Sequence, residues 1–346
     1  TDAFCQIRMD PNSQHLTAIN TPFGCYEWTI MPQSLCNAPA TWQRCINKAL
    51  AGLLGDICFA YIDDLIIFGA KTTEDHIRRC RKVLDALRKA GLLVNPQKSQ
   101  LFIENVDILG HTISKDGIQI DSKKVDKIAE WPRPTNKRQI QQFMGLVNYV
   151  RKFIAQLATP SHILMKLTRK NVPFVWTDEH KQAFEKIKEI TQNTPILKNI
   201  DYQSKDPIWL ITDASDTGIG ATLSQGPDWK TAPPISFESR SYVGNEERKL
   251  GEWRFSTPEK QLLAIINALK KWRHYLIGAK FTICTDHESI KYLMTKTVLS
   301  GREARWAGLL ADFDIEIKHI RGITNACGEA LRRFPYHQSK HGDITV

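Results

Sequence analysis

Residues 58–69 read CFAYIDDLIIFG, and this stretch decides the fold. Two short apolar runs flank the acidic pair Asp63 and Asp64, a pattern that predicts a strand, a tight turn and a second strand. Adjacent carboxylates repel each other, and apolar surroundings raise that cost. A divalent cation removes the repulsion, because carboxylate oxygens are the ligands that Mg²⁺ prefers. The stretch therefore indicates a hairpin with a metal-binding turn, and a solvent-exposed Asp-Asp turn is the alternative.

Composition places the chain among ordinary globular proteins. Its 346 residues predict two to three domains, and an apolar share of 42% excludes a disordered chain. No apolar run approaches the roughly 20 residues of a membrane span, and no signal peptide follows Thr1. The eight cysteines form no CxxC pair and indicate mostly buried thiols in a reducing compartment. The net charge of +10 favours a polyanionic partner.

Two helices are predicted with enough detail to be checked. Residues 75–90 place apolar side chains at helical spacing on one face: Ile77, Cys80, Leu84 and Leu87. The other face is basic and carries Arg78, Arg79, Arg81, Lys82, Arg88 and Lys89. A charged face is most often only solvated, and contact with phosphate is the alternative. A second helix should follow Thr135 as its cap, with an apolar stripe of Ile140, Phe143, Leu146, Val147 and Val150.

Several segments, in order, carry a resemblance to a known family. They are DAFCQIRMDP (2–11), TPFGCYEWTIMPQSLCNAPATWQR (21–44), YIDDLIIFG (61–69) and ILGHTISKDGI (108–118). This order resembles the reverse transcriptase of gypsy-like long-terminal-repeat retrotransposons. Two later segments resemble the connecting region and the ribonuclease H of the same polyprotein: WPRPTNKRQIQQFMGLVNYVRKFI (131–154) and TDASDTGIGATLSQ (212–225). The resemblance covers essentially the whole chain.

The resemblance implies an α/β (α+β) multidomain fold with a polymerase palm and thumb ahead of a ribonuclease H-like mixed-sheet domain. The expected domains are fingers and palm, truncated at the N-terminus (1–113), thumb and connection (114–204), the ribonuclease H-like domain (205–334), and a tail or linker (335–346).

By the same resemblance, Asp63 and Asp64 match the metal-binding pair of the polymerase. Phe4 matches the aromatic residue that crowds a ribose 2′-hydroxyl and selects deoxynucleotides. Gln33 lies in the segment that contacts the incoming nucleotide, and Ser34 stands where the family usually has Gly. If the backbone there needs a positive φ, serine is strained where glycine is not.

Leu109, Gly110 and His111 match the turn that grips the primer strand. The family's first metal-binding Asp would lie two residues before Thr1, outside this sequence.

The nuclease residues implied by the resemblance are Asp213, Asp286 and Glu329, where Glu329 replaces an Asp. Gln261 occupies the place of a Glu ligand that has been lost. Glu259 lies two positions earlier, about 200° around a helix, and is expected to point away. A neutral amide binds Mg²⁺ far more weakly than a carboxylate.

The implied function is RNA-directed DNA synthesis together with cleavage of RNA in hybrids. Two Mg²⁺ ions are expected in each active site, with Mn²⁺ as a substitute. The expected partners are RNA and DNA template–primer and deoxynucleoside triphosphates, and no membrane is involved. Protease and integrase segments of the polyprotein would lie outside this chain, and a cytoplasmic retroelement particle with access to the nucleus is the expected location. The alternative is a decayed or co-opted relic that binds nucleic acid with little or no catalysis.

Overall fold

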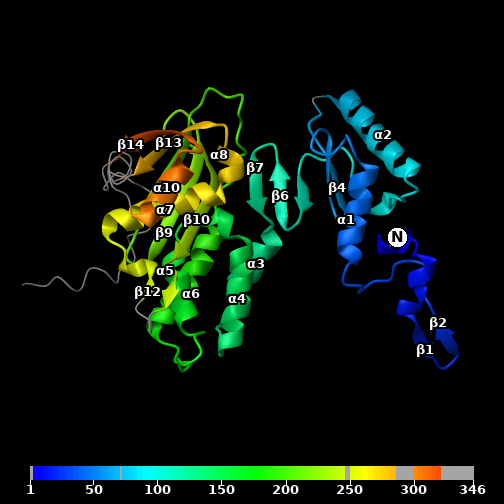
Figure 1. The fold of residues 1–346 in the computed structure, drawn as a ribbon, viewed down its shortest axis with the longest axis horizontal. Coiled ribbons are helices and arrows are strands. Elements are labelled where there is room, and N and C mark those ends of the chain that lie inside the picture. The colour runs from blue at the N-terminus through cyan, green and yellow to red at the C-terminus, as the bar shows by residue number, and fades with distance from the viewer. Residues whose placement is uncertain (1–2, 71, 246–249, 286–299, 321–346) are drawn as a thin grey trace, which may run out of the picture. The chain divides into compact units, whose positions relative to one another are not determined.

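A computed structural model describes the chain except for residues 1–2, 71, 246–249, 286–299 and 321–346 (Figure 1). The chain forms two compact units, Thr1–Glu104 and Asn105–Val346. Each unit has its own core, and each is described by itself. No helix in the described ranges is both long and apolar enough to cross a membrane.

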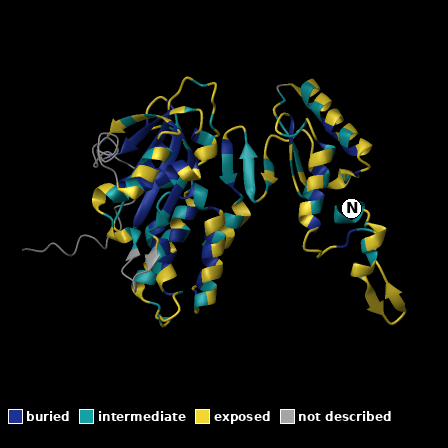
Figure 2. Ribbon diagram, viewed as in Figure 1, coloured by how far each residue is buried: buried dark blue, intermediate teal, exposed yellow. Residues whose placement is uncertain are grey.

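The first unit combines two antiparallel hairpins with two long helices. Its elements are η1 (Phe4–Gln6), η2 (Pro11–Thr17), β1 (Ile19–Thr21), β2 (Gly24–Tyr26), α1 (Ala38–Ala49), β3 (Cys58–Tyr61), β4 (Asp64–Ile67), α2 (Thr73–Lys89) and η3 (Pro96–Lys98). The β3–β4 pair confirms the hairpin predicted from residues 58–69. Both α1 and α2 pack against this hairpin, and the β1–β2 hairpin is exposed along its length (Figure 2).

Helix α2 confirms the predicted helix but buries a different set of side chains. Cys80, Val83 and Leu87 are buried, whereas Ile77 and Leu84 are 37% and 44% exposed. At about 100° per residue, Ile77 and Leu84 lie some 70–90° from the centre of the buried stripe. They therefore border the buried face, and the prediction that they share it was wrong.

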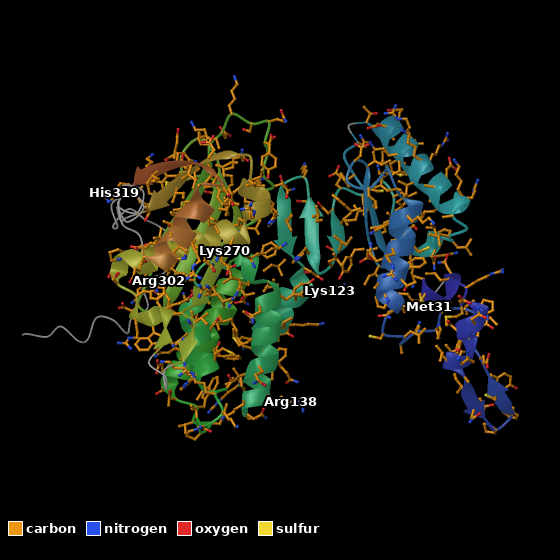
Figure 3. All side chains as sticks on the ribbon, viewed as in Figure 1. Met31, Lys123, Arg138, Lys270, Arg302 and His319 are labelled. Atoms are coloured by element: carbon orange, nitrogen blue, oxygen red, sulfur yellow. The ribbon has the colours of Figure 1, made fainter. Side chains whose placement is uncertain are left out.

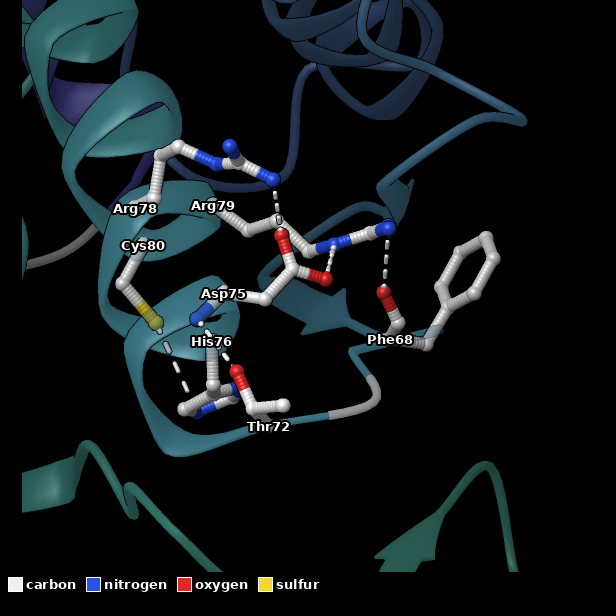
Figure 4. A network of polar contacts seen from close by, with 7 residues as sticks. All are labelled: Phe68, Thr72, Asp75, His76, Arg78, Arg79 and Cys80. Carbon is white, nitrogen blue, oxygen red and sulfur yellow. Dashed lines mark hydrogen bonds and ion pairs between the residues drawn. The ribbon is translucent and has the colours of Figure 1, made fainter.

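The start of α2 holds two of its basic side chains in a local network (Figure 4). The Thr72 hydroxyl caps the helix by accepting from the backbone N–H of Asp75. The Asp75 carboxylate pairs with Arg78 at 2.6 Å and with Arg79 at 3.0 Å, and these hydrogen bonds lower the pKa of Asp75. Arg79 also donates to the carbonyl of Phe68. Charge on this face therefore rests mainly with the later, exposed basic residues: Arg81, Lys82, Arg88 and Lys89.

The second unit begins with a β-meander and a group of helices. These are β5 (Val106–Ile108), β6 (His111–Ser114), β7 (Gly117–Ile120), α3 (Ser122–Ala129), α4 (Lys137–Tyr149), η4 (Arg151–Phe153), α5 (Ala158–Lys166) and α6 (Asp178–Gln192). Phe143, Phe153 and Phe184 are buried in the core that these helices share. The cap of α4 is Asn136, whose side chain accepts from the backbone N–H of Gln139. The prediction of Thr135 as the cap was wrong by one residue, since Thr135 instead donates to the side chain of Gln139.

A mixed sheet forms the rest of the second unit, in the strand order β10-β9-β8-β13-β14. Its strands are β8 (Ile208–Ala214), β9 (Gly218–Gln225), β10 (Pro234–Ser241), β13 (Lys280–Thr285) and β14 (Asp314–His319). Strands β8, β13 and β14 are parallel, and β9 and β10 run antiparallel to their neighbours. This sheet confirms the predicted mixed-sheet domain.

Smaller elements and three α-helices complete the described part: β11 (Gly244–Asn245), β12 (Leu250–Gly251), η5 (Glu252–Arg254), α7 (Thr257–Lys271), α8 (Arg273–Leu276) and α10 (Gly301–Leu310). Helix α7 lies against β8 and β9 and is buried almost continuously from Gln261 to Leu269. Helix α5 packs on β9 and β10, so the two cores of this unit are in contact.

Two glycines should respond in opposite ways to alanine. A Cβ on Gly117, where φ is 136°, would lie 2.2 Å from the carbonyl oxygen of Leu197, in a bridge that ties β7 to that segment. Gly117→Ala should lower the free energy of unfolding by roughly 1–3 kcal/mol. Gly145 lies exposed inside α4 with open space around it, so Gly145→Ala should raise that free energy by about 1 kcal/mol. Urea unfolding of both variants checks the pair, and equal shifts would contradict the packing described at Gly117.

Candidate active sites

The β3–β4 turn presents two carboxylates to solvent. Tyr61 and Asp64 form the last pair of the hairpin, so Ile62 and Asp63 alone make the turn. Ile62 has φ of 50°, in the left-handed region. Two-residue hairpins favour such angles because they match the twist of the strands, but a β-branched residue adopts them only under strain. Asp63 and Asp64 are both exposed. The structure thus brings the predicted acidic pair together at the tip of a tight turn.

Helix α1 holds this turn through two side chains for which the sequence predicts no individual role. The indole of Trp42 donates to the carbonyl of Ile62, and the side-chain oxygen of Gln43 accepts from the backbone N–H of Ile62. These contacts join residues about twenty positions apart in the chain, so no local sequence pattern predicts them.

The predicted nucleotide-binding residues lie in the segments around the start of the first unit. Phe4 is half-buried in η1 and packs against the core. Gln33 is exposed and lines a pocket of about 580 Å³, together with Cys5, Trp28 and Ser34. Cys5 borders this pocket, and Phe4 lies directly before it in the chain. Ser34 has φ of 75°, so the strain expected there from a positive φ is present.

The predicted primer-contacting turn joins β5 to β6. Leu109 and Gly110 have φ of 48° and 67°, which is the pattern of a primed two-residue turn. The hydroxyl of Tyr149 donates to the carbonyl of Leu109, and the Nζ atom of Lys124 lies 3.4 Å from the centre of the Tyr149 ring. A Cβ on Gly110 would overlap the side chain of Lys124. The turn is therefore backed by an aromatic ring and a cation.

His111 follows this turn in an aromatic setting. Its ring stacks on Tyr149 and tilts against Phe153, and its Nδ1 atom is buried without a hydrogen-bond partner. Burial, together with the nearby charges of Lys152 and Lys124, lowers the pKa of His111 to about 4. The imidazole is therefore neutral at physiological pH.

A second candidate site lies at the end of β8. Asp213 is fully buried, and the side-chain nitrogen of Gln261 on α7 donates to its Oδ1 atom at 3.3 Å. The structure thus places the amide of Gln261 against the carboxylate of Asp213. Glu259 is engaged elsewhere: it closes a capping box with Ser256 and pairs with Arg302. Arg302 lies on α10, where Figure 3 labels it. Asp286 and Glu329 lie outside the described residues.

The side chains at these sites differ in how well they suit a divalent cation. Within the described residues, no group of three or more His, Cys, Asp or Glu side chains converges on one point. Asp63 and Asp64 offer exposed carboxylate oxygens on one turn, and such oxygens suit a hard divalent cation. At Asp213 the neighbour is an amide, whose Oε1 atom is buried without a hydrogen bond. That oxygen is available as a ligand but carries no charge. The acidic turn fits a divalent cation, and the Asp213 site fits one less well.

Comparison with known families agrees with this geometry. Residues 1–113 match the family described as reverse transcriptase (RNA-dependent DNA polymerase). Residues 203–313 match the RNase H-like domain found in reverse transcriptase. The chain therefore carries a reverse transcriptase domain followed by an RNase H-like domain, an arrangement similar to that of transposon polyproteins. Families of this type use divalent metal ions.

Particular relatives support the assignment. The chain is 37% identical, over 99% of its length, to a retrovirus-related Pol polyprotein from transposon 297 of Drosophila melanogaster. It is 34% identical, over 96% of its length, to the Transposon Tf2-3 polyprotein of Schizosaccharomyces pombe. It spans 31% and 24% of those two polyproteins. A foamy viral protease–reverse transcriptase, solved in complex with double-stranded DNA, is similar with a TM-score of 0.78 and 25% identity, over 92% of this chain and 55% of that chain.

The depressed pKa of His111 predicts a pH dependence of stability. The unfolded histidine titrates near 6.5, so the unfolded chain takes up a proton before the folded one does. The stability associated with neutral His111 should be complete above about pH 6.5 and should be lost as the pH falls towards 4. His111→Gln should show a smaller loss over this interval, because carboxylates contribute equally to both proteins. Urea unfolding at several pH values measures the difference, and parallel curves would contradict the burial of His111.

Proposed function

We propose that this chain carries out template-directed DNA synthesis at the β3–β4 turn, using Mg²⁺ with Mn²⁺ as a substitute. The observation that carries the proposal is the exposed pair Asp63 and Asp64 on a fixed turn, inside a segment that matches the reverse transcriptase family. Mg²⁺ bound there, as one of two ions, would supply a Lewis acid that activates the primer 3′-hydroxyl and neutralises the leaving pyrophosphate.

The chain's own residues supply binding and orientation in this proposal. Asp63 and Asp64 hold the cations through their carboxylate oxygens. Phe4 limits the space at the sugar of the incoming deoxynucleoside triphosphate, and Gln33 contacts that nucleotide from the pocket lined by Cys5 and Trp28. The Leu109, Gly110 and His111 turn contacts the primer strand. The left-handed backbone at the first two of these residues fixes the shape of that turn.

The proposed partner is an RNA or DNA template with its primer. The net charge of +10 and the exposed basic residues of α2 favour a polyanion. The similar foamy viral protein was solved with double-stranded DNA.

The proposed domains are fingers and palm (1–113), thumb and connection (114–204), a nuclease-like domain (205–334) and a tail (335–346). Protease and integrase segments of the same polyprotein, and a cytoplasmic particle with access to the nucleus, are proposed by similarity to the transposon polyproteins.

The ribonuclease H-like domain is proposed to cleave hybrids slowly. Asp213, Asp286 and Glu329 are its proposed metal-binding carboxylates, and Gln261 takes the place of a fourth. The amide of Gln261 donates to Asp213 instead of adding negative charge. This contact also supports the second candidate function, a relic that binds nucleic acid without nuclease catalysis.

Asp63→Asn should abolish primer extension. The substitution keeps the shape of the side chain but removes the charge that holds the cation at the reacting 3′-hydroxyl. Extension of a DNA primer on an RNA template by the full-length protein, at fixed Mg²⁺, measures the effect. Asp56→Asn is the control, because Asp56 is exposed at the opposite end of β3. Equal loss in both variants, or none in Asp63→Asn, would place the chemistry elsewhere.

Phe4→Ala should allow the polymerase to incorporate ribonucleotides. Removing the ring opens the space that a 2′-hydroxyl would need. The ratio of kcat/KM for a deoxynucleotide to that for the matching ribonucleotide should fall, mainly through a gain for the ribonucleotide. An unchanged ratio with full polymerase activity would remove Phe4 from the nucleotide pocket.

Gln261→Glu should raise cleavage of RNA in an RNA–DNA hybrid. One well-placed electrostatic group at a reaction centre is typically worth about 10²–10³ in rate. Glu329→Asp alone should do little, because the charge missing at residue 261 remains missing. Single-turnover cleavage at fixed Mg²⁺ compares the parent with both variants. Fast cleavage by the parent, or rescue by Glu329→Asp alone, would show that the two substitutions are ranked wrongly.

A further inference from the structure

The strained residue of the acidic turn is held by hydrogen bonds on both of its backbone groups. Ile62 lies in the left-handed region with φ of 50°. Its N–H donates to the Oε1 atom of Gln43 at 2.8 Å, and its carbonyl accepts from the indole Nε1 of Trp42 at 2.8 Å. Because these groups belong to the peptides before and after Ile62, the two contacts together fix both of its backbone torsions.

The amide of Gln43 is itself oriented by further contacts. Its Nε2 atom donates to the carbonyl of Ala60 at 3.0 Å and to the Oδ1 atom of Asn47, one turn along α1, at 2.9 Å. The nitrogen thus faces two acceptors and the oxygen faces one donor, so the opposite orientation of the amide would break all three contacts. Trp42 is only 5% exposed and belongs to the core of the first unit. The hydrogen bond from Trp42 therefore connects the β3–β4 turn to that core.

The carbonyl held by Trp42 belongs to the peptide that joins Ile62 to Asp63. If this peptide rotates, the side chain of Asp63 points in a different direction. Asp64, the first residue of β4, is then displaced as well. A turn with a β-branched residue at positive φ would otherwise relax toward a more common conformation.

We propose that Gln43 and Trp42 are positioning residues that hold Asp63 and Asp64 in the geometry that binds the catalytic cations. Neither residue touches the substrate in this proposal. The inference rests on the proposed polymerase function. The effect of Gln43 and Trp42 on the conformation of Ile62 can be measured without that function.

Gln43→Met tests the proposal, because methionine has a similar length and helix propensity but no amide. The full-length variant should keep its affinity for primer–template, lose about 10²-fold in kcat, and need a higher Mg²⁺ concentration for half-maximal rate. Gln97→Met is the control, since Gln97 is an exposed glutamine of the same unit outside these contacts. A general loss of folding would lower the active fraction and the binding together, without moving the Mg²⁺ dependence.

A second variant isolates the backbone strain. Asparagine tolerates the left-handed region better than isoleucine does. Adding Ile62→Asn to Gln43→Met should therefore recover part of the lost kcat and shift the Mg²⁺ dependence back. Failure of this second change to recover any activity would overturn the idea that the hold acts through the conformation of residue 62.

Hydrogen exchange separates this inference from the proposed function. In the protein without nucleic acid, Gln43→Met should speed exchange of the Ile62 amide, and Gln97→Met should not. If Gln43→Met leaves exchange of the Ile62 amide unchanged, Gln43 does not hold the turn, whether or not polymerase activity changes. Faster exchange with unchanged kcat and Mg²⁺ dependence would overturn the positioning role. A parent that extends no primer would overturn the proposed function and the positioning role with it, while exchange would still decide whether the hold exists.

Discussion

Hydrogen bonds from one helix to the backbone of Ile62 decide where Asp63 and Asp64 lie. Two neighbouring carboxylates repel each other, and a tight turn that carries them has little to stabilise it locally. Here the turn also contains a β-branched residue at φ of 50°. Trp42 and Gln43 supply the missing stabilisation from α1, which is itself buried against the hairpin. Under the proposed function the acidic pair is held in place before metal binds, so a cation would meet two ligands that are already positioned.

The nuclease-like site balances charge in a different way. Asp213 is fully buried at the end of β8, where a lone carboxylate would be costly. The amide of Gln261 donates to it, so part of the need for a cation is met by the protein. A glutamate at 261 would add a second negative charge and restore that need. In the proposed function, Gln261 lets the domain fold around Asp213 and weakens the binding of metal at this site.

Local patterns in the sequence predicted the elements better than the contacts between them. The hairpin of residues 58–69, the helix over residues 75–90 and the helix after Thr135 follow from periodicity and turn residues, and the structure has all three. The burial of Val83 in place of Leu84 depends on which side of α2 meets the hairpin, and Asn136 caps α4 instead of Thr135 because of the backbone at that residue. Neither difference can be read from spacing alone.

Among the site residues, too, features of the local backbone could be predicted from the sequence, whereas contacts between distant segments could not. The positive φ at Ser34 could be anticipated from the glycine that the family usually has there. The contacts of Trp42 and Gln43 with Ile62 could not, because they join segments about twenty residues apart through buried side chains. The low pKa of His111 also depends on rings and lysines from α3, α4 and η4 that only the folded unit brings together. Asp286 and Glu329 remain predictions.

The catalytic role of the β3–β4 turn is tested most directly by a structure of the protein bound to an RNA template, a DNA primer and an incoming nucleotide, with Mn²⁺ located by its anomalous scattering. An Mn²⁺ peak is expected at bonding distance from a carboxylate oxygen of Asp63, with the primer 3′ end beside it and Ile62 still held by Trp42 and Gln43. A primer end bound away from the β3–β4 turn, or an Mn²⁺ ion that contacts neither Asp63 nor Asp64, would contradict it.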